Sequence, residues 1–409
     1  MVRLLENFSL ELIKQHDISV PSYSVVSKPE DAVGVCQELG GECVLKALVP
    51  TGKRGKAGAV RIINSLDKVE ENASAVMDSK VGFFPVNQLI VMEKLDIVRE
   101  FFVSITFDSN SNSPIVLLSK NGGVDIEELS ENNPEVITQI PLNILKEYSM
   151  EDIFPNIICS GFEDKIANQI AICVLKLFSM FKKCDCRMIE INPLVELKNG
   201  KISAASAVIT LDDQALFRQK KLKKFLPNDE GNGWRPLTDL ESKMKKIDEI
   251  DLDVASIRFG ELEGDIGFML TGGGYSLTGF SQIISNGGRP ASTFDITPGI
   301  NKVYQEKVSL AVELLLTKPG LKGLVIAGNV SNFTKVDVKM ESVVRALKNS
   351  RLDFKKFPVV IRFAGPGIER AREIVSELPD IHFYEKDFSL DDLSQKIVEL
   401  VYKRKVVSK

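Results

Sequence analysis

The sequence predicts an α/β protein whose second half is a doubly wound parallel sheet. From residue 266 onward, short apolar runs typical of buried strands alternate with segments of helical spacing. This order is expected of parallel strands joined by crossover helices. Three of the predicted strands end in glycine-bearing loops, at the edge where open sheets of this kind bind ligands. The first half combines helices with strands joined by short turns, so we expect a separate domain there.

Size and composition narrow the class of protein. At about 150 residues per domain, the 409 residues suggest two or three domains. Hydrophobic residues make up 44% and charged residues 26%, as is ordinary for a globular protein with a sizeable core. The net charge of −4 does not indicate the basic surface that nucleic-acid binding requires. No apolar segment has the length of a signal peptide or membrane span. The six cysteines form no CxxC motif, so we expect reduced thiols in a cytoplasmic protein rather than a zinc site.

Apolar periodicity and turn residues define the expected elements of the first half. A helix predicted at 28–39 ends at Gly40-Gly41, because glycine adopts the left-handed conformation that closes helices. Asn199-Gly200 predicts a tight hairpin turn. The other expectations are helices at 4–15 and 164–182 and strands at 43–49, 88–93, 100–107, 114–119, 188–195 and 202–211.

A basic glycine-rich loop follows the strand that contains Lys46. Residues 51–58 hold three glycines and three cations, so backbone N–H groups and basic side chains could close over phosphates. The glycine spacing is not that of a Walker A loop. The alternative is the mobile basic tip of a hairpin.

The predicted strand at 188–195 carries two polar side chains on one face. Glu190 and Asn192 are two residues apart, and the flanking isoleucines point the other way. Carboxylate and amide oxygens suit Mg²⁺ beside a nucleotide phosphate. Pro193 lacks a backbone donor, so we expect the strand to end there or to lie at a sheet edge. The alternative is an ordinary half-exposed strand.

A polar linker at 220–236 and a charged helix at 238–258 lead into the second half. The expected helix after Gly272-Gly273-Gly274 would direct its N-terminus toward an anion. Tight packing between strand and helix is the alternative explanation for these glycines. The expected strands are 266–271, 323–327, 358–363 and 381–384, and the helices are 275–285, 335–348, 368–378 and 389–403.

Five motifs occur in the order of a known family. They are Val44-Leu-Lys46-Ala, Arg54-Gly-Lys-Ala-Gly58, Lys120-Asn-Gly-Gly-Val-Asp-Ile-Glu127, Glu190-Ile-Asn-Pro-Leu and Ala215-Leu-Phe-Arg-Gln219. Over nearly its whole length the chain resembles the ATP-grasp, beta-type subunit of acid–CoA ligases. That family includes succinyl-CoA synthetase, ATP-citrate lyase and citryl-CoA synthetase.

The resemblance implies an N-terminal two-lobed ATP-grasp fold and a C-terminal flavodoxin-like CoA-ligase domain with a doubly wound parallel sheet. The ATP-grasp domain would span 1–228, with a small lobe inserted at about 21–97. A linker and helix would occupy 229–258, and the CoA-ligase domain 259–409.

The resemblance also implies an ATP and Mg²⁺ site. Glu190 would be the catalytic residue that meets a phosphorylated histidine, and Asn192 would hold Mg²⁺. Ser206 stands where the family has an aspartate metal ligand, so the metal would meet a neutral oxygen there. ATP would be bound by Lys46, Arg54, Gly55, Lys56, Glu93, Leu95 and Glu100.

The acid would bind at strand-end loops of the second half. Asn332-Phe333-Thr334 resembles the loop that grips citrate, whereas Gly287-Gly-Arg-Pro-Ala291 is more similar to succinyl-CoA synthetase. The citrate-lyase branch has two successive arginines where this chain has Arg362-Phe363. The loop residues implied are Gly272, Gly273, Gly274, Gly328, Asn329, Ser331, Asn332, Phe333 and Thr334.

The implied function is the formation of citryl-CoA from citrate and CoA with ATP. The chain has only two histidines, His16 and His382, and neither is on a loop placed to move between two sites. An alpha-type partner subunit would therefore carry the phosphohistidine and bind most of the CoA. The alternatives are the small subunit of ATP-citrate lyase, a succinyl- or malyl-CoA synthetase beta subunit, and a scaffold that has lost ATP chemistry.

Overall fold

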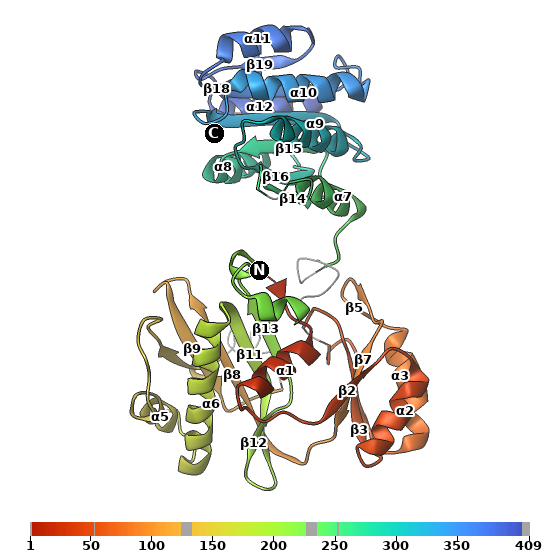
Figure 1. The fold of residues 1–409 in the computed structure, drawn as a ribbon, viewed down its shortest axis with the longest axis vertical. Coiled ribbons are helices and arrows are strands. Elements are labelled where there is room, and N and C mark those ends of the chain that lie inside the picture. Colours follow the sequence, from red (N-terminus) through yellow and green to blue (C-terminus); the bar gives the residue numbers. More distant parts are fainter. Residues whose placement is uncertain (1, 53, 124–132, 226–234, 252, 403–409) are drawn as a thin grey trace. The chain divides into compact units, whose positions relative to one another are not determined.

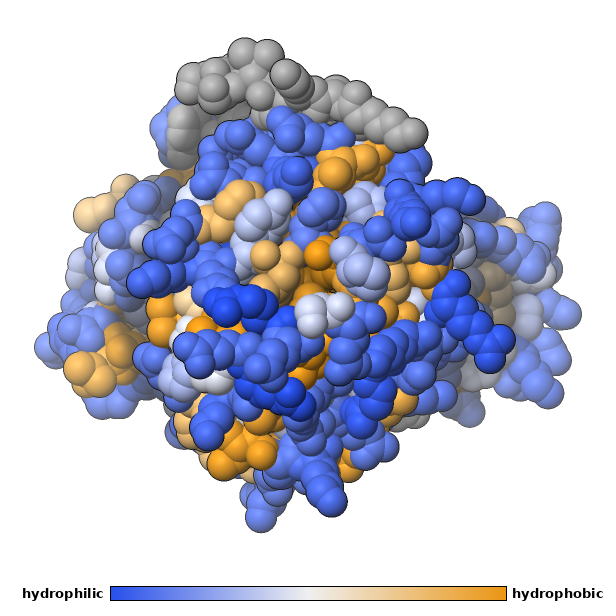
Figure 2. Space-filling view, turned by 90° about the horizontal axis from the view of Figure 1, so that it is seen from above, coloured by the Kyte–Doolittle hydropathy of each residue, from blue (hydrophilic) through white to orange (hydrophobic). Residues whose placement is uncertain are grey.

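The computed structural model describes residues 2–52, 54–123, 133–225, 235–251 and 253–402. The chain divides into two compact units, Met1–Pro236 and Leu237–Lys409 (Figure 1). Hydrophilic side chains cover most of the face seen in Figure 2, with hydrophobic ones between them, as on most globular proteins. In the described ranges, no helix combines the length and apolar character needed to cross a membrane.

The larger lobe of the first unit is built on an antiparallel sheet. Its described strands lie in the order β1-β13-β11-β8-β9-β10, and β12 pairs with β11. Helices α1 and α6 lie in front of this sheet in Figure 1, and their apolar residues share one core with it. The strands are β1 (Val2–Arg3), β8 (Ile97–Asp108), β9 (Ser113–Ser119), β10 (Thr138–Pro141), β11 (Cys186–Leu197), β12 (Ile202–Ala204) and β13 (Ala207–Leu211), and the helices are α1 (Glu6–Gln15), α5 (Met150–Cys159) and α6 (Asp164–Lys183).

The smaller lobe of this unit has its own sheet and its own core. Its strand order is β2-β7-β3-β4, and all three pairings are antiparallel. Leu45 and Val91 from the sheet pack with Ala32 and Ala73 from the two helices. The elements are β2 (Tyr23–Val26), α2 (Pro29–Glu38), β3 (Cys43–Ala47), β4 (Val60–Ile63), α3 (Val69–Met77), β5 (Lys80–Val81), β6 (Phe84–Pro85) and β7 (Leu89–Glu93).

The second unit is a parallel sheet covered by helices on both faces. Its strand order is β15-β17-β18-β19, and the antiparallel pair β14 and β16 lies beside β15. Successive residues of one strand face different cores: Ile326 packs with α9 and α10, whereas Val325 packs with α8 and α12. The elements are α7 (Asp239–Asp248), β14 (Ile257–Glu261), β15 (Ile266–Thr271), α8 (Gly273–Ser285), β16 (Ser292–Ile296), α9 (Lys302–Leu316), β17 (Gly323–Val330), α10 (Val336–Ser350), β18 (Val359–Ala364), α11 (Ile368–Ser376), β19 (His382–Tyr384) and α12 (Leu390–Tyr402).

This architecture confirms the predicted fold class, but three local expectations were wrong. The strand predicted at 202–211 is two strands, β12 and β13, separated by residues 205–206. The strand with Glu190 does not end at Pro193: β11 continues to Leu197 inside the sheet, between β13 or β12 and β8. Its register against β8 shifts between Ile191 and Leu194, and this bulge accommodates the missing donor of Pro193. The charged helix predicted at 238–258 is only ten residues long, because the chain turns into β14.

Candidate active site

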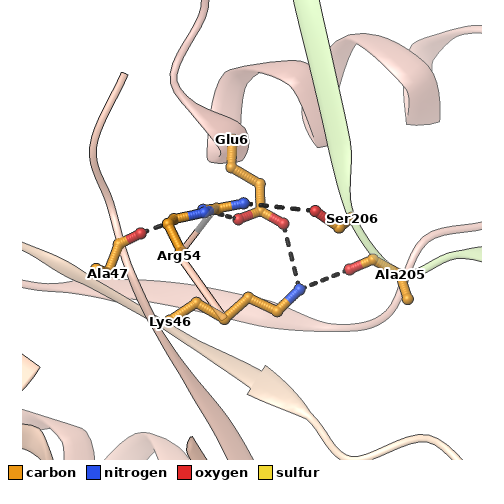
Figure 3. Close-up of polar contacts among 6 residues, drawn as sticks. All are labelled: Glu6, Lys46, Ala47, Arg54, Ala205 and Ser206. Carbon is orange, nitrogen blue, oxygen red and sulfur yellow. Dashed lines mark hydrogen bonds and ion pairs between the residues drawn. The ribbon is translucent and has the colours of Figure 1, made fainter. Parts of the chain in front are cut away.

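A buried carboxylate lies at the centre of the candidate nucleotide site (Figure 3). Glu6 begins α1 and is 3% exposed. Lys46 Nζ on β3 lies 3.2 Å from Glu6 Oε1, and the Arg54 guanidinium donates to Glu6 Oε2. Lys46 also donates to the carbonyl of Ala205 at 2.7 Å. Arg54 donates to the carbonyl of Ala47 at 3.2 Å. Two cations expected to bind phosphate thus meet around one anion from a distant helix.

The charge of Glu6 is set by these neighbours. Burial would raise the pKa of the Glu6 carboxyl, but attraction to Arg54 and Lys46 outweighs burial and lowers the pKa to about 2. A hydrogen bond with Ser206 contributes to this lowering. For Lys46, burial lowers the pKa of the ammonium and Glu6 opposes that effect. Glu6 is therefore anionic at neutral pH and compensates the charge of the cations beside it.

A signal for Glu6 was present in the sequence, although the sequence analysis missed it. The buried residues of α1 include Glu6, Ser9, Leu10 and Ile13, which follow the i, i+3, i+4, i+7 spacing of one helix face. Glu6 therefore occupies a position on the apolar stripe. Because a glutamate is almost never fully buried unless it is paired, that position predicts a buried cation from elsewhere in the chain.

The candidate metal ligands lie beside this cluster. Ser206, in the turn between β12 and β13, accepts a 3.5 Å hydrogen bond from Arg54. The backbone N–H of Asn192 donates to the Ser206 carbonyl at 3.2 Å. Asn192 Oδ1 accepts from Gly123 N at 2.8 Å. Glu190 and Asn192 are both half-buried on β11, and hydroxyl, amide and carboxylate oxygens together form a donor set that fits Mg²⁺.

Arg3 joins this site although the sequence analysis did not predict it. It lies on β1; burial lowers the pKa of its guanidinium, whereas the nearby Glu190 raises it and Arg54 lowers it. Arg3 is thus electrostatically coupled both to the candidate catalytic carboxylate and to the basic loop. This group carries a net positive charge, because it contains three cations (Arg3, Lys46 and Arg54) and two carboxylates (Glu6 and Glu190). A net positive charge favours a phosphate anion.

The expected adenine and ribose contacts lie near the connection between β7 and β8. Glu93 ends β7, and its carboxylate accepts from Ser22 N at 3.0 Å. Leu95 follows in the connection itself. Gly123 has a φ of +71°, and a Cβ there would lie 2.0 Å from Glu100 Oε2, so the close approach requires glycine. Since Gly123 also donates to Asn192, the structure brings the candidate ribose and metal ligands to one turn.

Two other residues that were expected to bind ATP lie outside the buried cluster. Gly55 and Lys56 are at the exposed tip of the loop that carries Arg54. Residues 124–127 of the Lys120–Glu127 motif lie outside the described residues.

The glycine loop before α8 is open rather than tightly packed. Gly272 has a φ of +101°, which favours glycine, and its N–H donates to Asp295 at 3.2 Å. A Cβ added at Gly273 or Gly274 would meet no atom within 4 Å. Strand–helix packing therefore does not explain these two glycines, and the exposed first turn of α8 is accessible to an anion.

The loop after β17 divides into fixed and exposed residues. Thr334 is 1% exposed, and its hydroxyl both donates to Gly299 O at 2.7 Å and accepts from Gly299 N at 3.1 Å. Ser331 is also buried, and its N–H donates to Ala364 O at 2.8 Å. Asn329, Asn332 and Phe333 are exposed, and Gly328 packs against Phe363. The loop is therefore anchored at both ends and presents the Asn332 amide to solvent.

We expect Glu6→Gln to lower the free energy of unfolding at pH 7 by about 3–5 kcal/mol, because a buried cation loses its anion. The folded pKa of Glu6, about 2, is below its ordinary value of 4.5. Its stabilisation is therefore present above pH 4.5 and is lost as the pH falls toward 2. Urea denaturation should show the difference between wild type and variant shrinking over that range.

The matched control is Glu38→Gln, which removes an exposed carboxylate from α2 and should behave as the wild type. If Glu6→Gln were as stable as the wild type at pH 7, the buried ion pair would not stabilise the fold.

Comparisons with known proteins support the fold of both units. A family model described as an ATP-grasp domain matches residues 3–196, and one described as ATP citrate lyase citrate-binding matches residues 235–400. The ATP citrate lyase from Methanothrix soehngenii, solved in complex with citrate and coenzyme A, has a TM-score of 0.76. That comparison covers 98% of this chain and 100% of that chain at 20% identity, so it shows a shared fold.

Curated relatives show the family. The beta subunit of the ADP-forming succinate–CoA ligase of Staphylococcus haemolyticus is 32% identical over 96% of this chain and 97% of its own length. The corresponding subunit of Rubrobacter xylanophilus is 28% identical over 97% of this chain and 98% of its own. The chain therefore belongs to the ATP-grasp acid–CoA ligase family that includes the succinate–CoA ligase beta subunits.

Proposed function

We propose that this chain is the ATP-grasp subunit of a two-subunit ligase that forms citryl-CoA from citrate, CoA and ATP. The choice of acid rests on the match of residues 235–400 to a citrate-binding family. The exposed Asn332, next to the anchored Ser331, supports it because an amide N–H group is a suitable donor for a carboxylate. The nucleotide would bind in the first unit and the acid at the strand-end loops of the second.

In this proposal the first unit acts mainly through positioning and charge. Phosphoryl transfer depends on neutralising charge on the transferred group, so Lys46, Arg54 and Lys56 would stabilise the phosphates. Bound Mg²⁺ would add positive charge there, held by Asn192 and Ser206. Glu190 would orient the histidine that receives the phosphoryl group.

The second unit would hold the acid while that phosphoryl group activates a carboxylate for attack by the CoA thiol. The N-terminus of α8 would assist through its dipole, by about 0.3–1 kcal/mol where exposed. That effect is too small to drive the chemistry, so the first unit and the partner must supply most of the rate enhancement.

We expect a partner subunit because one histidine of this chain caps a helix and the other lies on a strand. His16 ends α1, and its Nδ1 lies 2.9 Å from the carbonyl of Leu12, so it caps the helix. Glu6 is at the other end of that ten-residue helix, about 15 Å away. His382 is half-buried on β19 in the second unit. The phosphohistidine and most of the CoA pocket would therefore belong to an alpha-type partner.

Two other functions have support in particular observations. The succinate–CoA ligase beta subunits at 28–32% identity, with the segment Gly287–Ala291, favour succinate as the acid. Ser206 in place of a carboxylate favours a scaffold subunit with weak or no nucleotide binding. The absence of any thermal stabilisation by Mg-ATP would support the scaffold.

For the acid, we expect the complex with its partner to use citrate with a higher kcat/KM than succinate. Asn332→Ala should raise the KM for citrate by a factor equivalent to about 1.5–3 kcal/mol, because a donor to a carboxylate is lost. Steady-state kinetics with both acids tests this. Asn349→Ala, an exposed change near the far end of α10, is the control. Equal use of succinate and citrate by the wild type would reject citrate specificity.

For the metal, Ser206→Asp should tighten Mg-ATP binding or leave it unchanged, because it supplies an anionic oxygen ligand. Thermal shift with Mg-ATP, compared with ATP and EDTA, measures the effect. Ser206→Asn has a similar size without the charge and serves as the control. A large loss of Mg-ATP-dependent stabilisation in Ser206→Asp alone would mean that position 206 is not at the metal.

For the partner, γ-labelled ATP should label a histidine of the partner subunit only when both chains are present. The label should be acid-labile and should depend on Glu190, so Glu190→Gln should abolish it. The chain alone should show no acid–CoA ligase activity. A stable label on His16 or His382 of the isolated chain would overturn the two-subunit mechanism.

A further inference from the structure

Lys339 is a buried cation that pairs with no carboxylate of the described residues. It lies in the first turn of α10 and is 6% exposed. Its Nζ donates to Ser331 Oγ at 2.9 Å and lies 5.3 Å from the centre of the Phe363 ring. Among the described residues, no carboxylate is within ion-pair distance of this ammonium. Burial lowers the pKa of Lys339 to about 8, so the side chain is still mostly protonated at neutral pH.

Other buried lysines of the chain are neutralised. Lys307 is fully buried and donates to the Asp248 carboxylate and to three backbone carbonyls. Lys46 pairs with Glu6. Burying a charge without an opposite charge is costly, so proteins keep such groups mainly where they serve a function. Lys339 departs from the pattern of Lys46 and Lys307, which indicates that its anion comes from outside the fold.

The hydrogen bond to Ser331 shows where that anion would lie. A lysine ammonium can only donate, so Ser331 Oγ is the acceptor and its own proton must point elsewhere. The described residues provide no acceptor for that proton. Ser331 belongs to the anchored loop that also presents Asn332, and its N–H donates to Ala364 O at 2.8 Å, so its backbone is held against the end of β18. The Ser331 hydroxyl is therefore a fixed donor with a positive charge behind it.

We propose that Lys339 is a positioning residue for the acid, which acts by polarising Ser331 toward a carboxylate of the bound substrate. The inference rests on the proposed function, because it places the acid at the loop of residues 331–334. Charge-assisted hydrogen bonds to a carboxylate are about twice as strong as neutral ones, so the cation behind Ser331 favours an anionic substrate group over a neutral one. Phe363 is 1% exposed and packs against the ammonium. The ring thus excludes water from one side of the cation.

The test compares Lys339→Met and Lys339→Arg in the full chain by thermal shift and calorimetry with citrate and with succinate. Lys339→Met should weaken binding of the better acid by about 10- to 100-fold, the loss expected for a hydrogen bond to a charged group. Lys339→Arg should retain part of the acid affinity that Lys339→Met loses. Lys335→Met, an exposed change just before α10, is the matched control and should bind as the wild type.

Three readouts separate this role from a structural one. Without ligand, Lys339→Met should melt no lower than the wild type, because it removes an uncompensated buried charge. Ser331→Ala should weaken acid binding by a similar factor. The double variant, Ser331→Ala with Lys339→Met, should bind the acid no more weakly than either single variant. Mg-ATP binding should be unchanged in all variants.

Unchanged acid affinity in Lys339→Met would overturn the inference, and so would a wild type that binds neither acid. A lower melting temperature with unchanged acid affinity would assign Lys339 to stability alone. Failure of the proposed function is a separate result, because it is read from labelling of the partner histidine and from CoA-ester formation.

Discussion

The first unit depends on one buried carboxylate. Glu6 joins the first helix of the larger lobe, strand β3 of the smaller lobe, the basic loop at Arg54 and the turn at Ser206. A carboxylate can be buried only where cations and hydrogen-bond donors surround it, so these segments are held in one arrangement. The same cations are the candidates for phosphate binding. The contact that orders the lobes therefore also prepares the nucleotide site.

Among the described residues, the buried lysines divide into two that are paired with a carboxylate and one, Lys339, that is not. Lys46 and Lys307 have anionic or carbonyl partners inside the protein, and their burial can be explained by folding alone. Among the described residues, the hydrogen-bond partner of Lys339 is the Ser331 hydroxyl, which lies on a strand-end loop. A folded protein tolerates such a charge at the cost of stability, which is the usual sign of a group retained for binding.

The two units differ in the groups that they offer to an anion. The candidate nucleotide site has more cationic than anionic side chains, on strands and a loop, which would suit a highly charged phosphate chain. The second unit uses exposed backbone at the start of α8 together with an anchored loop that holds one amide and one polarised hydroxyl. Fewer charges and more directional donors favour discrimination between acids over strength of binding.

The sequence alone determined the elements that depend on local periodicity. Alternating strands and helices after residue 266, the glycine ends of helices, the Asn199-Gly200 hairpin and the shared face of Glu190 and Asn192 all follow from spacing along the chain. Only the tertiary structure decided how charges pair. Glu6 meets a lysine 40 residues away, and Arg54 meets Ser206 at a separation of 152 residues. The bulge that lets β11 pass Pro193 also depends on neighbouring strands. Periodicity specifies which face of an element is buried, whereas the partner that a buried charge finds there is set by segments that only the fold brings together.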